Sequence, residues 1–329
     1  MAGLQLTHTY HDRVSASYDG QPLFEYVYMP QGPATESLKP YFSPLYTLAG
    51  DDVTIYRPHD HPWHKGLQMT LTVVNDQNFW GGNTYVPEAD RQAVATQGAI
   101  RAESGFPFDP GTDSYALLDN IGRTEHDFWM AITCEENVIF LEHMLSWVTS
   151  RGETWLREQR RLTVQKVSII DGYWVLEWAS IFTNESGIPL EIGSPTTLGR
   201  PNAGYGGLFW RGPRSFADSA TIIAEGGLAG DTIMGQRAKW LAYSGLHDGT
   251  LRHSTLIFQD MPQNPRYPTQ WFVRAMPFAC ASMAFMFDEV YVMQPADRLN
   301  LRYRITIANG TLTTKQIIRL CQQLSTESR

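Results

Sequence analysis

Four successive runs rich in aromatic and β-branched residues occupy the middle of this chain: Phe128-Trp-Met-Ala-Ile-Thr-Cys134, Val138-Ile-Phe-Leu-Glu-His-Met-Leu-Ser-Trp-Val148, Thr154-Trp-Leu-Arg-Glu-Gln-Arg-Arg-Leu-Thr-Val-Gln-Lys-Val167 and Tyr173-Trp-Val-Leu-Glu-Trp-Ala-Ser-Ile-Phe-Thr-Asn184. Short polar separators such as Ser150-Arg-Gly152 and Asp171-Gly172 divide them. Strand-like runs that are joined by tight turns predict an antiparallel sandwich or barrel.

The same pattern extends outward from these runs. Towards the N-terminus, strands are predicted at residues 4–17, 22–29 and 67–74, with a hairpin signal at Tyr18-Asp-Gly-Gln21. Towards the C-terminus they are predicted at residues 190–195, 219–225, 237–244, 250–259, 270–273, 278–287 and 299–308. Thr313 with Gln316 then forms a capping-box pattern before a short amphipathic helix. No repeat or linker divides the chain, so we expect a single large, mainly β domain over residues 1–329.

Composition and charge narrow the classes of function. A net charge of −8 over 329 residues argues against a nucleic-acid partner and fits a neutral or cationic small substrate. No apolar run approaches the roughly 20 residues that span a bilayer, and the N-terminal residues lack the pattern of a signal peptide. Cys134, Cys280 and Cys321 are odd in number and far apart, as expected of thiols in a reducing compartment. We therefore expect a cytoplasmic protein with no membrane partner.

The richest cluster of chemically capable side chains is Pro58-His-Asp-His-Pro-Trp-His-Lys-Gly66, which holds three of the nine histidines. Pro58 and Pro62 favour extended backbone before them, so His59 and His61 are expected to share one face of a strand. Imidazoles this close together indicate a functional site more strongly than a structural one. The prediction is a site built from His59, Asp60, His61 and His64.

One interpretation of this segment is a divalent metal site. The spacing His-x-His-x-x-His can hold zinc or iron through neutral imidazoles, with Glu142 or His143 as a candidate fourth ligand. Known metal motifs fit poorly, because Trp63 stands where a metallo-β-lactamase has aspartate, and no glutamate follows at the cupin spacing. No cofactor is therefore predicted with certainty, and a divalent metal is kept as one alternative.

The other interpretation is acid–base chemistry on a sugar, with one histidine as general acid and a carboxylate as general base. The candidate carboxylates are Asp60, Glu142, Asp288 and Glu289. Tryptophan faces can stack on pyranose rings, and the candidates are Trp63, Trp80, Trp210 and Trp271.

Two further segments have polar and aromatic residues in a pattern that fits ligand binding. Residues 198–214 contain Gly204, Gly206 and Gly207, which allow close backbone approach, and also Arg200 and Arg211, which can pair with a carboxylate or with hydroxyls. The alternative interpretation is that this segment binds no ligand and is a glycine-rich β loop whose arginines contribute to solubility. The weaker segment, residues 264–274, ends in Arg274.

Several of these segments together resemble an uncharacterised bacterial family labelled "methane oxygenase PmoA". The resemblance covers residues 41–310 and rests on Tyr41-Phe-Ser-Pro-Leu45, the histidine segment, Asn75 to Trp80, Gly206-Gly-Leu-Phe-Trp-Arg211 and Trp271-Phe-Val-Arg274. Trp63 stands where that family has the first histidine of a His-His pair, and His64 keeps the second. A methane-oxidising subunit would lie in a membrane, so neither oxygenase activity nor copper is carried over.

The resemblance implies a large β-sandwich of the supersandwich, galactose-mutarotase-like kind, and relatives that accompany sugar-oxidising and glycan-degrading enzymes. The leading hypothesis is a carbohydrate-active enzyme that isomerises, epimerises or cleaves a sugar or an oxidised sugar derivative. Its main groups would be His61 and His64, supported by His59 and Asp60, with Lys65, Arg200 and Arg211 orienting substrate oxygens. The alternatives are a non-catalytic carbohydrate-binding protein and a metal-dependent hydrolase or lyase. The sequence specifies neither the sugar nor the oligomeric state.

Overall fold

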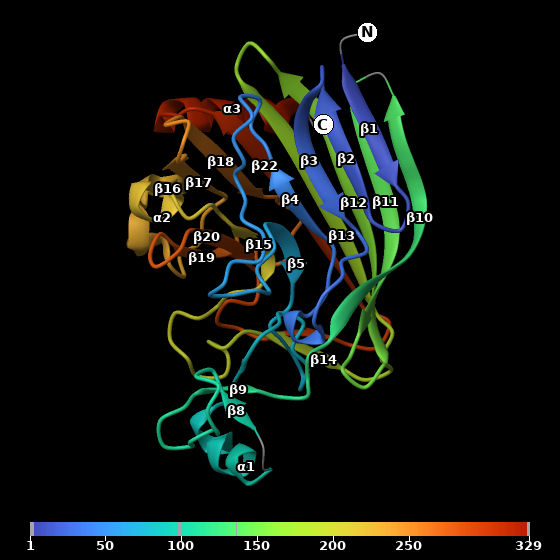
Figure 1. Ribbon diagram of the computed structural model, residues 1–329, viewed down its shortest axis with the longest axis vertical. Helices are drawn as coiled ribbons and strands as arrows, with labels where there is room; N and C mark the ends of the chain where they lie inside the picture. The colour runs from blue at the N-terminus through green and yellow to red at the C-terminus, as the bar shows by residue number, and fades with distance from the viewer. Residues whose placement is uncertain (1–2, 98–99, 136, 328–329) are drawn as a thin grey trace.

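Two eight-stranded antiparallel sheets face each other in the computed structural model, which describes residues 3–97, 100–135 and 137–327 (Figure 1). The first sheet has the order β1 (Leu4–Thr9), β2 (Arg13–Tyr18), β3 (Gln21–Val27), β4 (Tyr41–Leu45), β5 (Leu67–Thr70), β15 (Gly207–Arg211), β20 (Cys280–Ala284) and β19 (Gln270–Arg274). The second has the order β10 (Arg123–Glu135), β11 (Val138–Val148), β12 (Thr154–Ser168), β13 (Tyr173–Asn184), β22 (Arg298–Asn309), β18 (His253–Asp260), β17 (Trp240–Leu246) and β16 (Thr221–Ala224).

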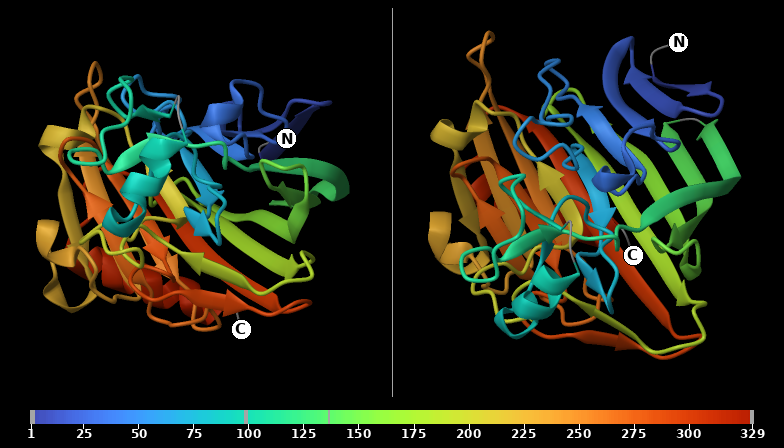
Figure 2. Two further views of the ribbon diagram at one scale, coloured as in Figure 1. Left: turned by 90° about the horizontal axis from the view of Figure 1, so that it is seen from below. Right: turned by 60° about the horizontal axis from the view of Figure 1, so that its bottom comes forward.

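Smaller elements surround these sheets (Figure 2). A three-stranded sheet consists of β21 (Tyr291–Met293), β14 (Leu190–Gly193) and β6 (Val73–Val74). The helix α3 (Thr314–Glu327) packs on the outer face of the second sheet through Ile317, Cys321 and Leu324. The other short helices are η1 (Ala34–Glu36), α2 (Phe216–Ser219), η3 (Glu225–Gly227) and η4 (Gly230–Ile233).

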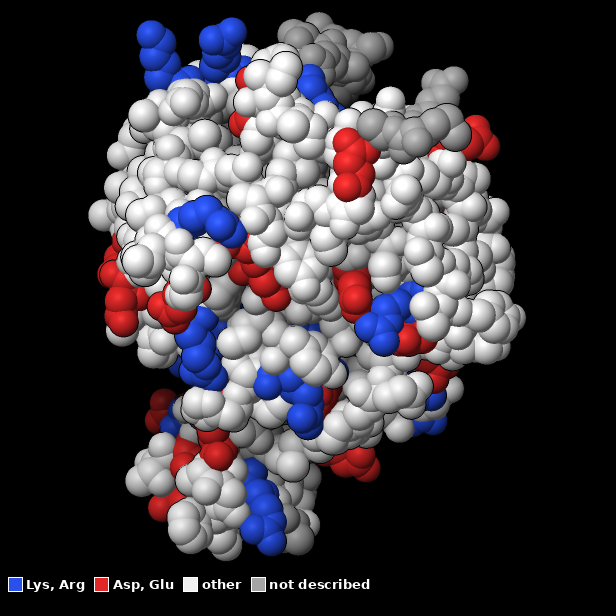
Figure 3. Space-filling view, turned by 45° about the horizontal axis from the view of Figure 1, so that its top comes forward, with Lys and Arg blue, Asp and Glu red and all other residues white. Residues whose placement is uncertain are grey.

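Residues 84–117, here called the small module, project from one end of the sandwich (Figures 1 and 2). The small module contains β7 (Thr84–Tyr85), η2 (Glu88–Asp90), α1 (Arg91–Thr96), β8 (Arg101–Ala102) and β9 (Tyr115–Leu117). Its separate core consists of Val86, Val94, Ala102, Phe108 and Ala116. On the face drawn in Figure 3, acidic and basic side chains are interspersed over both the sandwich and the small module.

The main core lies between the sheets because alternate side chains of each long strand point inward. On β13 the inward residues include Trp174 and Trp178, and on the opposite sheet Phe24 and Phe42 meet them. The ring centroids of Phe24 and Trp174 are 6.2 Å apart, and those of Phe42 and Trp178 are 5.9 Å apart. Large aromatic side chains of both sheets therefore fill the space between them.

The predicted mainly β class, the antiparallel sandwich and the short C-terminal helix are confirmed, and the Thr313–Gln316 capping box forms. Residues 4–17 form two strands instead of one, because the chain turns at His11, whose φ is 60°. The glycine-rich segment of residues 198–214, for which a loop was one of two interpretations, contains the buried strand β15. In the described part of the chain, no helix is long and apolar enough to cross a membrane.

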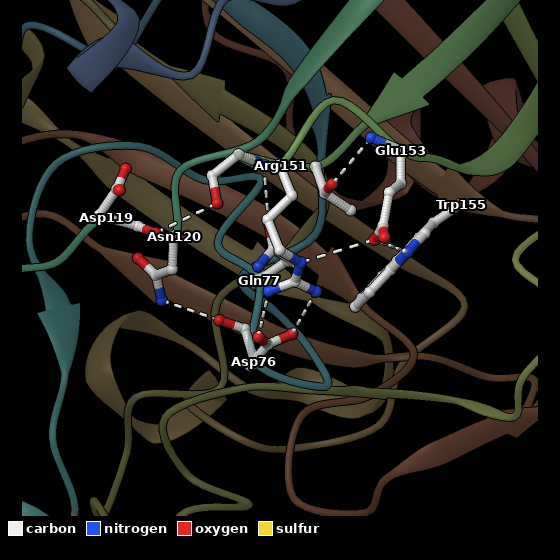
Figure 4. Close-up of polar contacts among 9 residues, drawn as sticks. Asp76, Gln77, Asp119, Asn120, Arg151, Glu153 and Trp155 are labelled. Atoms are coloured by element: carbon white, nitrogen blue, oxygen red, sulfur yellow. Dashed lines mark hydrogen bonds and ion pairs between the residues drawn. The ribbon is translucent and has the colours of Figure 1, made fainter.

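A polar cluster fixes the segments that lead into and out of the small module (Figure 4). Arg151, in the turn between β11 and β12, donates to the Asp76 carboxylate over 2.6 Å. Asn120, just after the small module, donates to the Asp76 carbonyl over 2.9 Å, and the Gln77 side chain accepts from the Ser150 amide over 2.8 Å. The cluster ties both connections of the small module to one turn of the second sheet.

Gly66 closes the histidine segment, and we predict that it tolerates no side chain. Its φ is +59°, and a Cβ there would meet the Phe42 carbonyl oxygen at 2.1 Å. Because left-handed strain and overpacking add, Gly66→Ala should lower the free energy of unfolding by about 2–4 kcal/mol. The matched control is Gly20→Ala, at φ +82° with open space around its Cβ, which should cost about 1 kcal/mol. Equal costs in urea titrations would contradict the clash with Phe42.

Candidate active site

A cavity of about 240 Å³ lies between the histidine segment, the first sheet and the small module. The histidine segment contributes His61, Trp63 and His64, and the small module with the residue before it contributes Asn83, Glu103 and Tyr115. The remaining lining residues come from several loops and from strands of the first sheet: Trp80, Arg200, Tyr205, Phe209, Phe272, Arg274, Pro277 and Phe278.

The histidine segment is a folded loop and not the extended strand that its prolines predicted. The His61 amide donates to the Pro58 carbonyl over 3.1 Å, and the His64 amide donates to the His61 carbonyl over 2.9 Å. These two turns stack the His64 ring on the His61 ring, with centroids 4.7 Å apart and planes 15° apart. His59 points elsewhere and contacts Arg214, so the expected face shared by His59 and His61 is wrong.

Asp60 sets the tautomer of His61. The Asp60 carboxylate lies 2.9 Å from His61 Nδ1 and also accepts from Arg211 over 2.8 Å. Partial burial alone would raise the pKa of Asp60, but the bonds from Arg211 and His61 hold it well below its usual range. An ionised carboxylate can only accept, so Nδ1 of His61 carries the proton and Nε2 keeps its lone pair.

Burial lowers the pKa of His61, while Asp60 and Glu103 oppose this shift. At neutral pH His61 is therefore a neutral imidazole with a free basic nitrogen.

His64 has the opposite hydrogen-bonding pattern. Its Nδ1 lies 2.7 Å from Arg211 Nη1, and a guanidinium only donates, so Nδ1 accepts and Nε2 carries the proton. The side chain is 2% exposed, and burial lowers its pKa well below the usual value. Among the described residues the Nε2–H group is buried without a hydrogen-bond partner. The His64 side chain, which lines the cavity, thus has a neutral N–H donor without an acceptor among the described residues.

Aromatic rings form one continuous wall of the cavity. Trp80 lies 5.2 Å from His64, Tyr205 lies 4.7 Å from Trp80, and Phe272 lies 5.4 Å from Tyr205, measured between ring centroids. Phe278 covers the other side, 4.9 Å from the His61 ring and 3.8 Å from the Arg211 guanidinium. Rings in this arrangement present apolar faces that suit the C–H faces of a small polyol.

The structure assembles some of the predicted site residues and not others. His61, His64, Trp63, Trp80, Arg200 and Arg274 line the cavity. Asp60 and Arg211 stand behind the two histidines, so Arg211 positions His64 and Asp60 instead of facing a ligand. Lys65 was expected to orient substrate oxygens, but it is buried with its Nζ 3.0 Å from the Glu36 carboxylate.

The predictions for Trp210 and Trp271 as sugar-stacking residues are also wrong. Both side chains are buried in the main core, because β15 and β19 run through the first sheet. Their indole N–H groups donate to backbone carbonyls, that of Trp210 to Val53 over 2.8 Å and that of Trp271 to Ala238 over 2.9 Å.

The other candidate carboxylates lie outside the cavity as well. Glu142 bonds to Gln159 and Arg161 on the second sheet, Asp288 accepts from Gln270, and Glu289 pairs with Arg266.

The predicted metal site is not assembled. Within the described residues, no group of three His, Cys, Asp or Glu side chains could hold a metal ion. Arginines donate to Nδ1 of His59 and of His64, and such cations oppose a bound metal. His143, the candidate fourth ligand, instead lies inside the sandwich with its Nε2 2.9 Å from the Tyr26 hydroxyl. The residues that are present therefore do not fit the His-x-His-x-x-His metal hypothesis.

Sequence reasoning missed the residues that complete the cavity. Glu103 is the carboxylate of the lining, and it comes from a segment with no regular pattern. Tyr115 and Tyr205 were also missed, and their hydroxyls lie 3.0 Å apart across the boundary between the small module and the sandwich. No local signal marks these residues, because only tertiary packing brings them to the histidines.

Comparisons with known proteins found one matching family model and several similar solved structures. A family model described as "Family of unknown function (DUF6807)" matches residues 13–322. No curated protein matches the sequence.

Three of the similar solved structures are distant. A GH36 α-galactosidase from Geobacillus stearothermophilus is 11% identical over 93% of this chain and 41% of its own, with a TM-score of 0.41. An α-galactosidase from Lactobacillus brevis is 10% identical over 95% and 40%, with a TM-score of 0.38. A galactose 1-epimerase from Lactobacillus acidophilus is 7% identical over 94% and 100%, with a TM-score of 0.38. The chain spans about two fifths of each α-galactosidase.

Proposed function

The chain belongs to the family of unknown function that matches residues 13–322, and we propose that its cavity moves protons on a sugar or an oxidised sugar derivative. The proposed activity is of the epimerase or isomerase type. In it His61 acts as the general base, and His64 is the hydrogen-bond donor to the oxygen that gains negative charge.

The observation that carries this proposal is the complementary state of two stacked imidazoles. His61 presents a lone pair at Nε2, because Asp60 holds the proton on Nδ1. His64 presents an N–H at Nε2, because Arg211 occupies Nδ1. A base beside a neutral donor is what proton abstraction next to a developing oxyanion requires, and a neutral imidazole can serve as such a donor.

Opening of a cyclic hemiacetal illustrates the balance of the reaction. His61 Nε2 takes the proton of the anomeric hydroxyl, a carbonyl forms at the anomeric carbon, and the bond from that carbon to the ring oxygen breaks. The ring oxygen gains the electron pair and is stabilised by His64 Nε2–H. The ring-oxygen alkoxide then attacks the other face of the carbonyl, and the protonated His61 returns its proton to the new anomeric oxygen, which gives the other anomer. Aromatic packing along Trp80 and Tyr205 supports a ring-shaped ligand.

The test compares two replacements of His64. NMR exchange measurements on a panel of aldoses and uronates should find a substrate for the wild-type protein. His64→Phe keeps a ring but removes the donor, and it should lower kcat by about 10²–10³-fold. His64→Gln keeps an acceptor for Arg211 and an N–H donor, and it should recover part of that loss.

The control is His59→Gln, which lies outside the cavity lining and should change turnover little. Sugar binding by the wild-type protein without exchange of any sugar would overturn the proposal in favour of a carbohydrate-binding protein. Equal activity of His64→Phe and the wild-type protein would also overturn it.

A further inference from the structure

We propose that the ligand of this cavity carries a carboxylate, which Arg274 and Arg200 hold beside the aromatic wall. This inference rests on the proposed function and names the class of substrate as sugar acids, such as uronates. An anionic substrate differs from the neutral or cationic substrate that the net charge of the chain by itself would suggest.

Arg274 is the first observation. It ends β19, the edge strand of the first sheet, and its guanidinium lies 5.3 Å from the Phe272 ring. No hydrogen bond or ion pair joins that guanidinium to any of the described residues, whereas Arg13, Arg157 and Arg252 each meet a carboxylate. A partly buried guanidinium that lines a cavity without a counter-charge is suited to hold an anion.

Arg200 adds a second cation to the same lining. It donates to the Tyr115 hydroxyl, and its guanidinium lies 4.9 Å from the Tyr115 ring. Tyr115 in turn lies 3.0 Å from the Tyr205 hydroxyl, so Arg200 is anchored while several of its five N–H donors stay free. Its contacts hold it beside the aromatic wall without a carboxylate partner among the described residues.

The charges of the lining favour an anion. Arg200 and Arg274 are positive, Glu103 is negative, and burial keeps His61 and His64 neutral at neutral pH. The cavity therefore has an excess positive charge inside a protein whose net charge is −8. Field lines in a recessed site raise the local concentration of ions of the opposite sign, so this local excess outweighs the distant acidic surface.

The ring contacts give the direction in which a sugar acid would lie. Phe272 touches both Arg274 and Tyr205, Tyr205 touches Trp80, and Trp80 touches His64. Arg274 faces Cys280 across β19 and β20, and Cys280 faces Arg211 across β20 and β15, so Arg274 lies two strands, roughly 10 Å, from the arginine that contacts His64. A carboxylate at Arg274 thus leaves room for the rest of a small sugar between Arg274 and the His61–His64 pair.

The test measures dissociation constants by calorimetry for matched pairs of probes: D-glucuronate with D-glucose, and D-galacturonate with D-galactose. Each uronate should bind about tenfold or more tightly than its neutral partner, because a hydrogen bond to a charged group is worth more than one to a neutral group. Arg274→Gln should remove most of this preference and leave the affinity for the neutral sugar nearly unchanged. Arg319→Gln, on the exposed face of α3, removes the same charge far from the cavity and should leave the preference intact.

The outcomes separate this inference from the proposed function. If neutral sugars bind as tightly as uronates while His64→Phe still lowers the exchange rate as predicted, the carboxylate inference is wrong and the proposed enzymatic activity is retained. If uronates bind preferentially but none is turned over, the carboxylate inference is supported and the proposed enzymatic activity is contradicted. Tighter binding of glucose 6-phosphate than of glucuronate would show that the anion is a phosphate. An Arg274→Gln variant with full uronate preference would also overturn the assignment.

Discussion

Replacing His61 by glutamine is expected to lower the turnover of a sugar substrate by about 10²–10⁴-fold while changing its dissociation constant little. Glutamine can still donate to Asp60 and fill the space beside His64, but it has no basic nitrogen. The loss should therefore appear in kcat and not in the binding of ligand. Calorimetry and NMR exchange on the same protein samples measure the two quantities separately. A variant with lost affinity and unchanged kcat would contradict the role of His61 as the base.

The pH dependence gives an independent check on the same residue. Only neutral His61 can act as a base, and burial lowers its pKa below the ordinary value of 6.5. The acidic limb of kcat/KM should therefore lie below pH 6.5, with activity rising as pH rises through it. Asp60 opposes the effect of burial, so Asp60→Asn should move the limb to still lower pH and also reduce kcat, because the tautomer of His61 is no longer fixed. An acidic limb above pH 7 would identify a different group.

Replacing Arg160 by leucine is expected to lower the free energy of unfolding by about 3–5 kcal/mol. Arg160 and Glu158 are fully buried between the sheets, with Nε of Arg160 2.7 Å from Glu158 Oε1. Arg160 also donates to Tyr26 over 3.0 Å, and Glu158 accepts from Trp147 Nε1 over 2.8 Å. Removing the guanidinium leaves a buried carboxylate with no counter-charge, which is more costly than the loss of the pair itself.

Two further variants make this prediction specific. Arg157→Leu changes the same residue type on the same strand, where the side chain is 33% exposed and pairs with Asp127, and it should cost about 1 kcal/mol or less. Adding Glu158→Gln to Arg160→Leu removes the stranded charge, so the double variant should be more stable than Arg160→Leu alone. Urea titrations with unchanged m-values measure all three. A double variant less stable than the single one would show that Glu158 is not the origin of the cost.

The long strands could be predicted from the sequence because their information is local. The predicted runs at residues 138–148 and 173–184 coincide with β11 and β13, since each run is rich in the aromatic and β-branched residues that favour strands. The turn at His11 was missed because neither glycine nor proline marks it. The strand β15 was missed because Gly204, Gly206 and Gly207 at its start are typical of a loop, although its five residues are all buried.

The candidate site also has some features that the local sequence predicts and others that depend on tertiary contacts. The histidine segment could be selected as the candidate site from the sequence, because three imidazoles and a carboxylate fall within six residues. The tertiary contacts turn His59 away, leave a lone pair on His61 and an N–H on His64, and bring Glu103, Tyr115 and Arg274 to the lining of the same cavity. Strand formation depends on neighbours a few residues apart, so it can be predicted locally. The protonation of each imidazole nitrogen depends instead on Asp60 and Arg211. Arg211 reaches the histidines because β15 pairs with β5, from which it is separated by more than a hundred residues of chain.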